Sequence, residues 1–395
     1  MLPERKPIRL VHIMTVPLSL GFFRGQVSYM KERGFEVHMI CSPGEALQRF
    51  GEQEQVAVHA VPMSRRITPF QDLAALVRLC HRLSQIRPQI VHAHTPKGGL
   101  LGMLAARITH VPIRIYHVHG LPFMTAKGFR RLILRLSERT ACLLASRVLC
   151  VSHSIREIAV AERLCSPEKV KVLLHGSGNG VDAVSRFNPA YADEGLRRQV
   201  RAQAGIPADA LVIGFVGRIV RDKGIVELAE AWLRLRDEFN VLYLLLVGPF
   251  EPQDPLPEEV VHLLRSDPRI RLVDLVDNIF PFYAAMDIVT LPSYREGFPN
   301  VPLEAAAMQI PVVATRIPGC VDAVQDGLTG TLITPQDAEA LATALRMYLN
   351  DPELRQRHGR AAREYVLANF RPEDIWEALY REYEDLLSLS CCKAL

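Results

Sequence analysis

The chain has 395 residues, of which 49% are hydrophobic and 23% are charged. This composition excludes an intrinsically disordered chain, and the length exceeds what one hydrophobic core usually serves, so we expect two globular domains. No apolar run approaches the ~18 residues of a membrane span, and the first seven residues lack the apolar core of a signal peptide. Eight cysteines without a C-x-x-C pair argue against a zinc site. We therefore expect a cytoplasmic protein.

Short β-branched runs alternate with amphipathic helical patterns in the first half of the chain. One helical pattern covers residues 26–33 and stops at Gly34, and another covers 72–85. Such alternation favours βαβ units and a parallel sheet, whose ligands bind at the carboxyl ends of the strands. The predicted strands cover residues 9–16, 36–41, 56–61, 89–94, 113–118, 148–151 and 170–174.

Four histidines lie near the ends of two predicted strands. His117 and His119 alternate, so they point to the same face, and each is also compatible with a core histidine bonded to backbone. His92 and His94 have the spacing of metal ligands on a strand, but the sequence offers no third ligand beside them. We therefore interpret His92 and His94 as structural residues.

Positive charge gathers in the first half of the chain. Residues 1–185 contain 25 Lys and Arg against 12 Asp and Glu, whereas the remainder contains 22 against 31. Within the basic half, residues 124–147 combine six cations with apolar residues at helical spacing and one acid, Glu138. Such a helix could lie on an anionic bilayer or pack into the core with a solvated basic face. The apolar residues are Phe129, Leu132, Ile133, Leu136 and Leu143, and the cations are Lys127, Arg130, Arg131, Arg135, Arg139 and Arg147.

The alternation restarts after a glycine-rich segment, residues 176–182, which we interpret as a linker between two Rossmann-like domains. Helical patterns begin at Ile225 and Asp337, and a third covers 303–308. The second series therefore predicts another parallel sheet. Its strands cover residues 211–216, 241–247, 271–273, 288–291 and 312–314.

Two strand-to-helix loops of the second half carry the residues best suited to chemistry. Arg218 and Lys223 stand between the strand that ends before Gly217 and the helix that begins near Ile225. A guanidinium fork and an ammonium beside free N–H groups can neutralise a diphosphate leaving group without a metal. A surface Arg and Lys on a turn is the alternative.

The second loop, residues 293–305, follows a strand and opens a helix. Asn300 is suited to the N-cap position, Pro302 fits the first turn, and the free N–H groups there could hold a phosphate. Glu304 could accept both hydroxyls of a ribose, and Glu296 could accept a bond from a sugar hydroxyl. The alternative is that Glu304 complements the helix dipole and Glu296 is a solvated loop charge.

Glu296 and Glu304 resemble the E-x7-E pattern of the family 4 retaining glycosyltransferases. The resemblance extends over nearly the whole chain, through motifs in the same order. The first half is similar to enzymes that build lipid-linked precursors of capsules, exopolysaccharides and glycans. The matching stretches are residues 23–26, 94–99, 119–123, 179–182, 217–224, 318–319 and 326–330.

The resemblance implies an α/β fold of GT-B architecture, in which two Rossmann-like domains with parallel sheets face a central cleft. Residues 1–182 would form an acceptor-binding domain and 183–370 a nucleotide-sugar-binding domain, while a helix in 371–395 would cross back to the first domain. His119, Glu296, Arg218 and Lys223 would act in catalysis, with His119 against the donor sugar. The donor would be bound by Arg218, Lys223, Glu296, Gly297, Phe298, Pro299, Asn300, Val301, Glu304 and Gly21.

Many members of the family carry a Gly-Gly pair just after the first strand, which is absent from residues 19–25 here. Gly21 could still allow close backbone approach to donor or acceptor. Lys97 and Arg24 are our candidates for contacts to the acceptor. The implied reaction moves a hexose or N-acetylhexosamine from a nucleotide diphosphate sugar, with UDP expected, to a lipid-linked or saccharide acceptor. We expect no cofactor, no metal and no nucleic acid partner. An anionic membrane surface would hold the enzyme peripherally on the inner face of the cell membrane.

Two other functions compete with this interpretation. A non-hydrolysing nucleotide-sugar epimerase shares the GT-B fold but lacks the E-x7-E frame, and a catalytically silent partner subunit would only bind a nucleotide sugar or a membrane. An NAD enzyme is disfavoured because no G-x-G-x-x-G follows the first strand.

Overall fold

The computed structural model describes residues 7–392 and divides the chain into two compact units. Unit 1 comprises residues 1–179 together with 372–395, and unit 2 comprises residues 180–371. The first boundary therefore lies three residues before the predicted one. Residues 1–6, on which the expectation of a missing signal peptide largely rests, lie outside the described range.

Unit 1 is built on a seven-stranded sheet in the order β3-β2-β1-β4-β5-β6-β7, with every pairing parallel. Its strand β7 is shorter than predicted because a turn at Gly176, whose N–H bonds the carbonyl of Leu173, ends the extended run. The strands are β1 Ile8–Ile13, β2 Phe35–Cys41, β3 Ala57–Ala60, β4 Ile90–His94, β5 Ile113–Val118, β6 Arg147–Cys150 and β7 Val170–Lys171.

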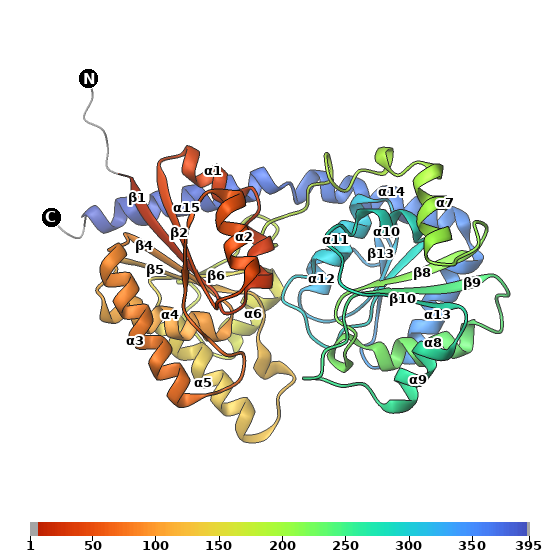
Figure 1. Cartoon of the computed structure of the whole chain (residues 1–395), viewed down its shortest axis with the longest axis horizontal. Coiled ribbons are helices and arrows are strands. Elements are labelled where there is room, and N and C mark those ends of the chain that lie inside the picture. Colours follow the sequence, from red (N-terminus) through yellow and green to blue (C-terminus); the bar gives the residue numbers. More distant parts are fainter. Residues whose placement is uncertain (1–6, 393–395) are drawn as a thin grey trace. The chain divides into compact units, whose positions relative to one another are not determined.

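Alternation along these strands feeds two separate cores, one on each face of the sheet (Figure 1). One face is covered by α3 Pro69–Ile86, α4 Pro96–Ile108, α5 Gly128–Leu144 and α6 His153–Ala161. The other is covered by η1 Pro17–Phe23, α1 Gln26–Glu32, α2 Glu45–Glu54 and the C-terminal α15 Pro372–Cys392. A short η2, Pro122–Met124, precedes α5. The C-terminal helix thus completes the core of unit 1.

Unit 2 repeats the design with a six-stranded parallel sheet in the order β10-β9-β8-β11-β12-β13. The strands are β8 Leu211–Val216, β9 Leu242–Val247, β10 Ile270–Val273, β11 Ile288–Leu291, β12 Val312–Thr315 and β13 Gly330–Ile333. The helices are η3 Pro189–Tyr191, α7 Glu194–Gln203, η4 Arg221–Lys223, α8 Ile225–Leu235, α9 Glu258–Ser266, α10 Phe280–Ala285, α11 Asn300–Ala307, α12 Cys320–Ala323, α13 Ala338–Asn350 and α14 Pro352–Asn369.

The sequence prediction of two α/β domains with parallel sheets is confirmed. In each unit the neighbouring strands from the middle of the sheet, β1 and β4 or β8 and β11, end at a common edge. The loops that follow these strands carry most of the predicted site residues.

Candidate active site

The two predicted donor loops of unit 2 meet at the carboxyl ends of β8 and β11. Gly224, between η4 and α8, has a φ of 71°, and a side chain there would overlap the carbonyl oxygen of Pro292, just after β11. Two hydrogen bonds join the loops: Tyr294 N–H donates to Asp222 O at 2.9 Å, and Arg295 donates to the Asp222 carboxylate at 3.0 Å. Glycine at 224 is therefore what allows this close approach.

Lys223 and Glu296, one from each loop, form an ion pair. The Lys223 and Glu296 side chains are only 18% and 13% exposed, so the pair is largely shielded from water. Sequence reasoning placed both residues in the site but did not predict that they contact one another. Arg218 is more exposed and donates to Glu251 at 2.7 Å, a partner that no motif indicated.

Glu304 lies in α11 beyond its first turn, which holds no acidic residue. The Tyr283 hydroxyl donates a hydrogen bond to the Glu304 carboxylate at 2.8 Å. Burial raises the pKa of Glu304, and the Tyr283 bond opposes that shift. Only the ionised form of Glu304 offers both carboxylate oxygens purely as acceptors, because the protonated acid turns one of them into an O–H donor. Tyr283 comes from α10, and its place in a helical run of apolar residues gave no signal that it would reach the site.

The loop before α11 positions the remaining donor residues. The helix begins at Asn300, and Pro299 occupies the N-cap, so the expectation that Asn300 caps the helix is wrong by one residue. Because proline offers no capping side chain, the first N–H groups are left to other acceptors, as an anion site at a helix N-terminus requires. Gly297 approaches Gly319 closely, Phe298 packs on Phe370 with ring centroids 5.5 Å apart, and Val301 is half-buried in the first turn.

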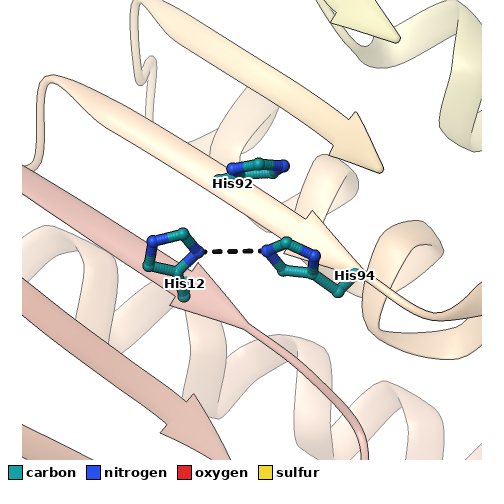
Figure 2. Close-up of side chains that lie close together, drawn as sticks. All are labelled: His12, His92 and His94. Carbon is teal, nitrogen blue, oxygen red and sulfur yellow. Dashed lines mark hydrogen bonds between the residues drawn. The ribbon is translucent and has the colours of Figure 1, made fainter. Parts of the chain in front are cut away.

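His119 lies in unit 1, one residue beyond the end of β5, and its Nε2 lies 3.0 Å from Nδ1 of His94. His94 Nε2 in turn lies 3.0 Å from Nδ1 of His12 on β1 (Figure 2). Burial lowers the pKa of His119 to about 4 and that of His12 to about 3, so both imidazoles are neutral at pH 7.

Two further histidines complete this cluster. His92 Nδ1 contacts the hydroxyl of Tyr383 on α15 at 2.6 Å, while His92 Nε2 and His117 Nδ1 are buried without a hydrogen-bond partner among the described residues. The inference that His92 and His94 lack a third potential metal ligand is therefore wrong, because His12 supplies one from the neighbouring strand. Among the residues that the structure describes, two groups have nitrogens close enough to hold a metal ion: His12 with His92 and His94, and His94 with His117 and His119.

The remaining candidate residues of unit 1 differ in how exposed they are and in whether they are ion-paired. Gly21 lies in η1, and a side chain there would meet no heavy atom of a described residue within 4 Å. Arg24 is exposed. Lys97, in the first turn of α4, forms an ion pair with Asp72 at 2.7 Å and is only 14% exposed, so it must leave this partner to reach an acceptor.

The predicted basic helix is α5, which is shorter than the stretch from which it was inferred. Its buried residues are Glu138, Ala141 and Cys142, and Glu138 accepts a hydrogen bond from Tyr116 at 2.6 Å. Four of the five apolar residues named above are exposed, by 76% at Phe129, 48% at Leu132, 51% at Leu136 and 62% at Leu143. The alternative of a helix that packs this apolar row into the core is therefore wrong.

Comparison with known proteins places this architecture in a family. Residues 22–176 match the glycosyl transferase 4-like domain, and residues 210–351 match the model of glycosyl transferases group 1. The capsular polysaccharide biosynthesis glycosyltransferase CapM of Staphylococcus aureus is 33% identical over 97% of this chain and 98% of its own.

Two other similar proteins carry informative names. The UDP-Gal:alpha-D-GlcNAc-diphosphoundecaprenol alpha-1,3-galactosyltransferase of Escherichia coli is 27% identical over 88% of this chain and 89% of its own. The crystal structure of Anabaena Alr3699/HepE in complex with UDP-glucose has a TM-score of 0.78 at 20% identity, covering 96% of this chain and all of that one. The matched domains and the two parallel-sheet units show that this chain is a GT-B enzyme belonging to the group 1, family 4-like glycosyltransferases.

Proposed function

We propose that the chain transfers a hexose or an N-acetylhexosamine from a UDP-sugar to a lipid-linked or saccharide acceptor, with retention at the anomeric carbon. The observation that carries this proposal is the Lys223–Glu296 ion pair, which joins a cation suited to a diphosphate to a carboxylate suited to a sugar hydroxyl. The donor and acceptor classes are supported by the E. coli relative, named for UDP-Gal and a diphosphoundecaprenol acceptor, and by the UDP-glucose complex of the Anabaena protein.

The reaction would use electrostatic stabilisation in place of a metal. Negative charge grows on the diphosphate as the glycosidic bond breaks, and Arg218, Lys223 and the N-terminus of α11 offer positive charge there. Glu304 would hold the ribose, and Glu296 and the neutral His119 would hold the sugar. No cofactor or metal is needed for these steps.

The proposal is tested by donor binding followed by transfer. We expect UDP-sugars to raise the melting temperature of the purified chain above any effect of GDP-, ADP- or dTDP-sugars. The stabilising donor should then release UDP when a polyprenyl-diphosphate-linked monosaccharide is added. Stabilisation by another nucleotide class would refute the choice of UDP, and UDP release with no glycosylated lipid or saccharide would refute transfer.

We further propose that unit 1 binds the surface of an anionic membrane through α5. The exposed residues Phe129, Leu132, Leu136 and Leu143 follow helical spacing and so form one apolar row. The same helix carries the exposed cations Arg130 and Arg139, and the exposed Lys127 precedes it. Apolar side chains that enter the headgroup region and cations that meet anionic lipid act together in peripheral binding. No helix in the described part of the chain is long and apolar enough to cross a membrane.

A second apolar row lies on α3, on the same face of the sheet. Phe70, Leu73 and Val77 are exposed by 91%, 60% and 63%, and Arg66 and Arg78 beside them are exposed as well. Helix α4 packs against both α3 and α5, so all three helices belong to one layer (Figure 1). This layer therefore presents two exposed apolar rows together with exposed cations.

Co-sedimentation with vesicles of phosphatidylglycerol tests the membrane proposal. Arg131 and Arg135 are ion-paired to Glu162 at 3.0 and 2.8 Å, so neither residue is altered. The test variant combines Phe129→Ser, Leu132→Ser and Arg130→Glu. We expect binding by the unchanged protein that weakens with salt and falls at least tenfold in the variant. Leu328→Ser, at a 54% exposed apolar residue of unit 2, is the control. Equal binding by all three proteins would refute the proposal.

A further inference from the structure

Three histidines of unit 1 form a continuous hydrogen-bonded chain that ends at the candidate catalytic residue. His12 Nδ1 faces His94 Nε2, and His94 Nδ1 faces His119 Nε2, each at 3.0 Å. His12 and His94 are buried on adjacent strands, whereas His119 is partly exposed. The chain thus runs from the interior of the unit to its surface.

A row of neutral imidazoles can be hydrogen-bonded in only two ways. A neutral ring has one N–H donor and one acceptor nitrogen, so the middle ring must donate to one neighbour and accept from the other. In the first arrangement His119 donates from Nε2 to His94, His94 donates from Nε2 to His12, and all three carry their proton on Nε2. In the second arrangement every bond is reversed and all three carry it on Nδ1. The tautomers of the three rings are therefore coupled.

We propose that His94 and His12 are positioning residues of the transferase site, which fix the orientation and the tautomer of His119. This inference rests on the proposed role of His119 in holding the donor sugar. The Nδ1 of His119 makes no hydrogen bond to a described residue and lies beside Gly178, where a side chain would contact the ring at 3.4 Å. Nδ1 is therefore the His119 nitrogen available to a sugar hydroxyl. The hydrogen bonds from His119 through His94 to His12 determine whether Nδ1 donates or accepts.

The residues around His12, His92 and His94 favour neutral, hydrogen-bonded imidazoles over a bound metal ion. The described residues that hydrogen-bond or stack with His12, His92 and His94 are other histidines, Tyr383 and Phe23, and they offer no carboxylate to balance a buried dication. One ring nitrogen of His12 and one of His94 are already hydrogen-bonded to each other, at 3.0 Å. Burial keeps these imidazoles neutral, as tautomer coupling requires.

Long-range ¹H–¹⁵N NMR of the histidine rings tests the proposal in the unaltered protein. We expect His12, His94 and His119 to carry their protons on the same type of nitrogen, all Nε2 or all Nδ1. Mixed tautomers among the three rings would overturn the proposal. Stoichiometric zinc or nickel in the purified protein, removed by His12→Phe, would overturn it as well, because a metal would occupy the bonding nitrogens.

Variants then test whether His12, which is not hydrogen-bonded to His119, affects the tautomer of His119 through His94. His12→Phe removes a ring that is hydrogen-bonded to His94 and not to His119, yet it should change the His119 tautomer populations. His94→Phe should do so too and should lower kcat at least about tenfold, with the affinity for UDP within about twofold of the unaltered protein. His59→Phe is the matched control, since it breaks another imidazole pair, to His38 at 3.2 Å, on the same sheet.

Two results of the variants would overturn the inference. One is a His119 spectrum that is unchanged in both His12→Phe and His94→Phe, and the other is the same change in the His59→Phe control. Failure of the proposed function would look different, because the unaltered protein would then show no transfer to an acceptor while the shared tautomer of the three rings remained visible. Failure of the His119 role alone would appear as full transfer activity in His119→Ala.

Discussion

Replacing Lys223 by alanine probes the part of the site where the two donor loops meet. Removal of one charge-assisted contact to a leaving diphosphate costs about 2–4 kcal/mol of transition-state stabilisation. Since each 1.36 kcal/mol is tenfold in rate, kcat should fall about 30- to 900-fold. The substitution also leaves Glu296, whose side chain is 13% exposed, without its partner, which adds repulsion towards the donor phosphates.

A second substitution separates these two causes. If the loss came mainly from the unpaired Glu296, Lys223→Ala combined with Glu296→Gln would regain much of the activity; we expect no such recovery, because the diphosphate has lost its cation. Turnover is followed as UDP release, and circular dichroism verifies the fold. Arg346→Ala breaks an exposed ion pair of unit 2, to Glu238 at 2.6 Å, and should leave kcat unchanged. A kcat of Lys223→Ala within threefold of the unaltered enzyme would refute the assignment.

Three further predictions follow from the same geometry. Transfer should continue at full rate in excess EDTA, because cationic side chains take the place of a metal; abolition that Mg²⁺ or Mn²⁺ reverses would contradict this. Glu304→Gln should weaken UDP binding at least about tenfold in calorimetry, since a carboxylate that accepts ribose hydroxyls is lost, and unchanged affinity would contradict the ribose role. Burial lowers the pKa of His12 to about 3 from about 6.5 in the unfolded chain, so its contribution to stability is present above pH 6.5 and is lost as the pH falls towards 3. By pH 5 this loss is about 2 kcal/mol. The free energy of unfolding of His12→Phe, measured by denaturant titration, should therefore fall about 2 kcal/mol less between pH 7 and pH 5 than that of the unaltered protein. An equal fall in both proteins would contradict the prediction.

The sequence was sufficient for the architecture because parallel sheets leave a strong local signal. Buried strands such as β8 and β9 read as short apolar runs, and the glycines after them mark the turns where backbones approach. The boundaries were less exact where a turn competes with extension, as at the end of β7.

The candidate site was predictable as a set of motifs but not as a set of contacts. Lys223 and Glu296 lie 73 residues apart, and the ion pair between them depends on how β8 and β11 are ordered in the sheet. Tyr283 and Glu251 reach the site from segments with no motif of their own. His12 escaped notice for the same reason, since its neighbours in space, His92 and His94, come from a strand 80 residues later.

The apolar row on α5 shows a different limit. Helical spacing indicated that Phe129, Leu132 and Leu136 share a face, but periodicity alone does not decide whether that face is turned to the core or to the outside. The structure turns it outward, because the small residues Ala141 and Cys142 and the bonded Glu138 fill the inner side.

We propose above that this chain moves a sugar from UDP to an acceptor with retention at the anomeric carbon. The most direct test is ¹H NMR of the reaction between the stabilising UDP-sugar and a polyprenyl-diphosphate-linked monosaccharide, read at the anomeric proton of the new linkage. We expect an α-linked product from the α-linked donor, formed in step with UDP. A β-linked product, or an epimerised donor with no new glycosidic bond, would contradict the proposal.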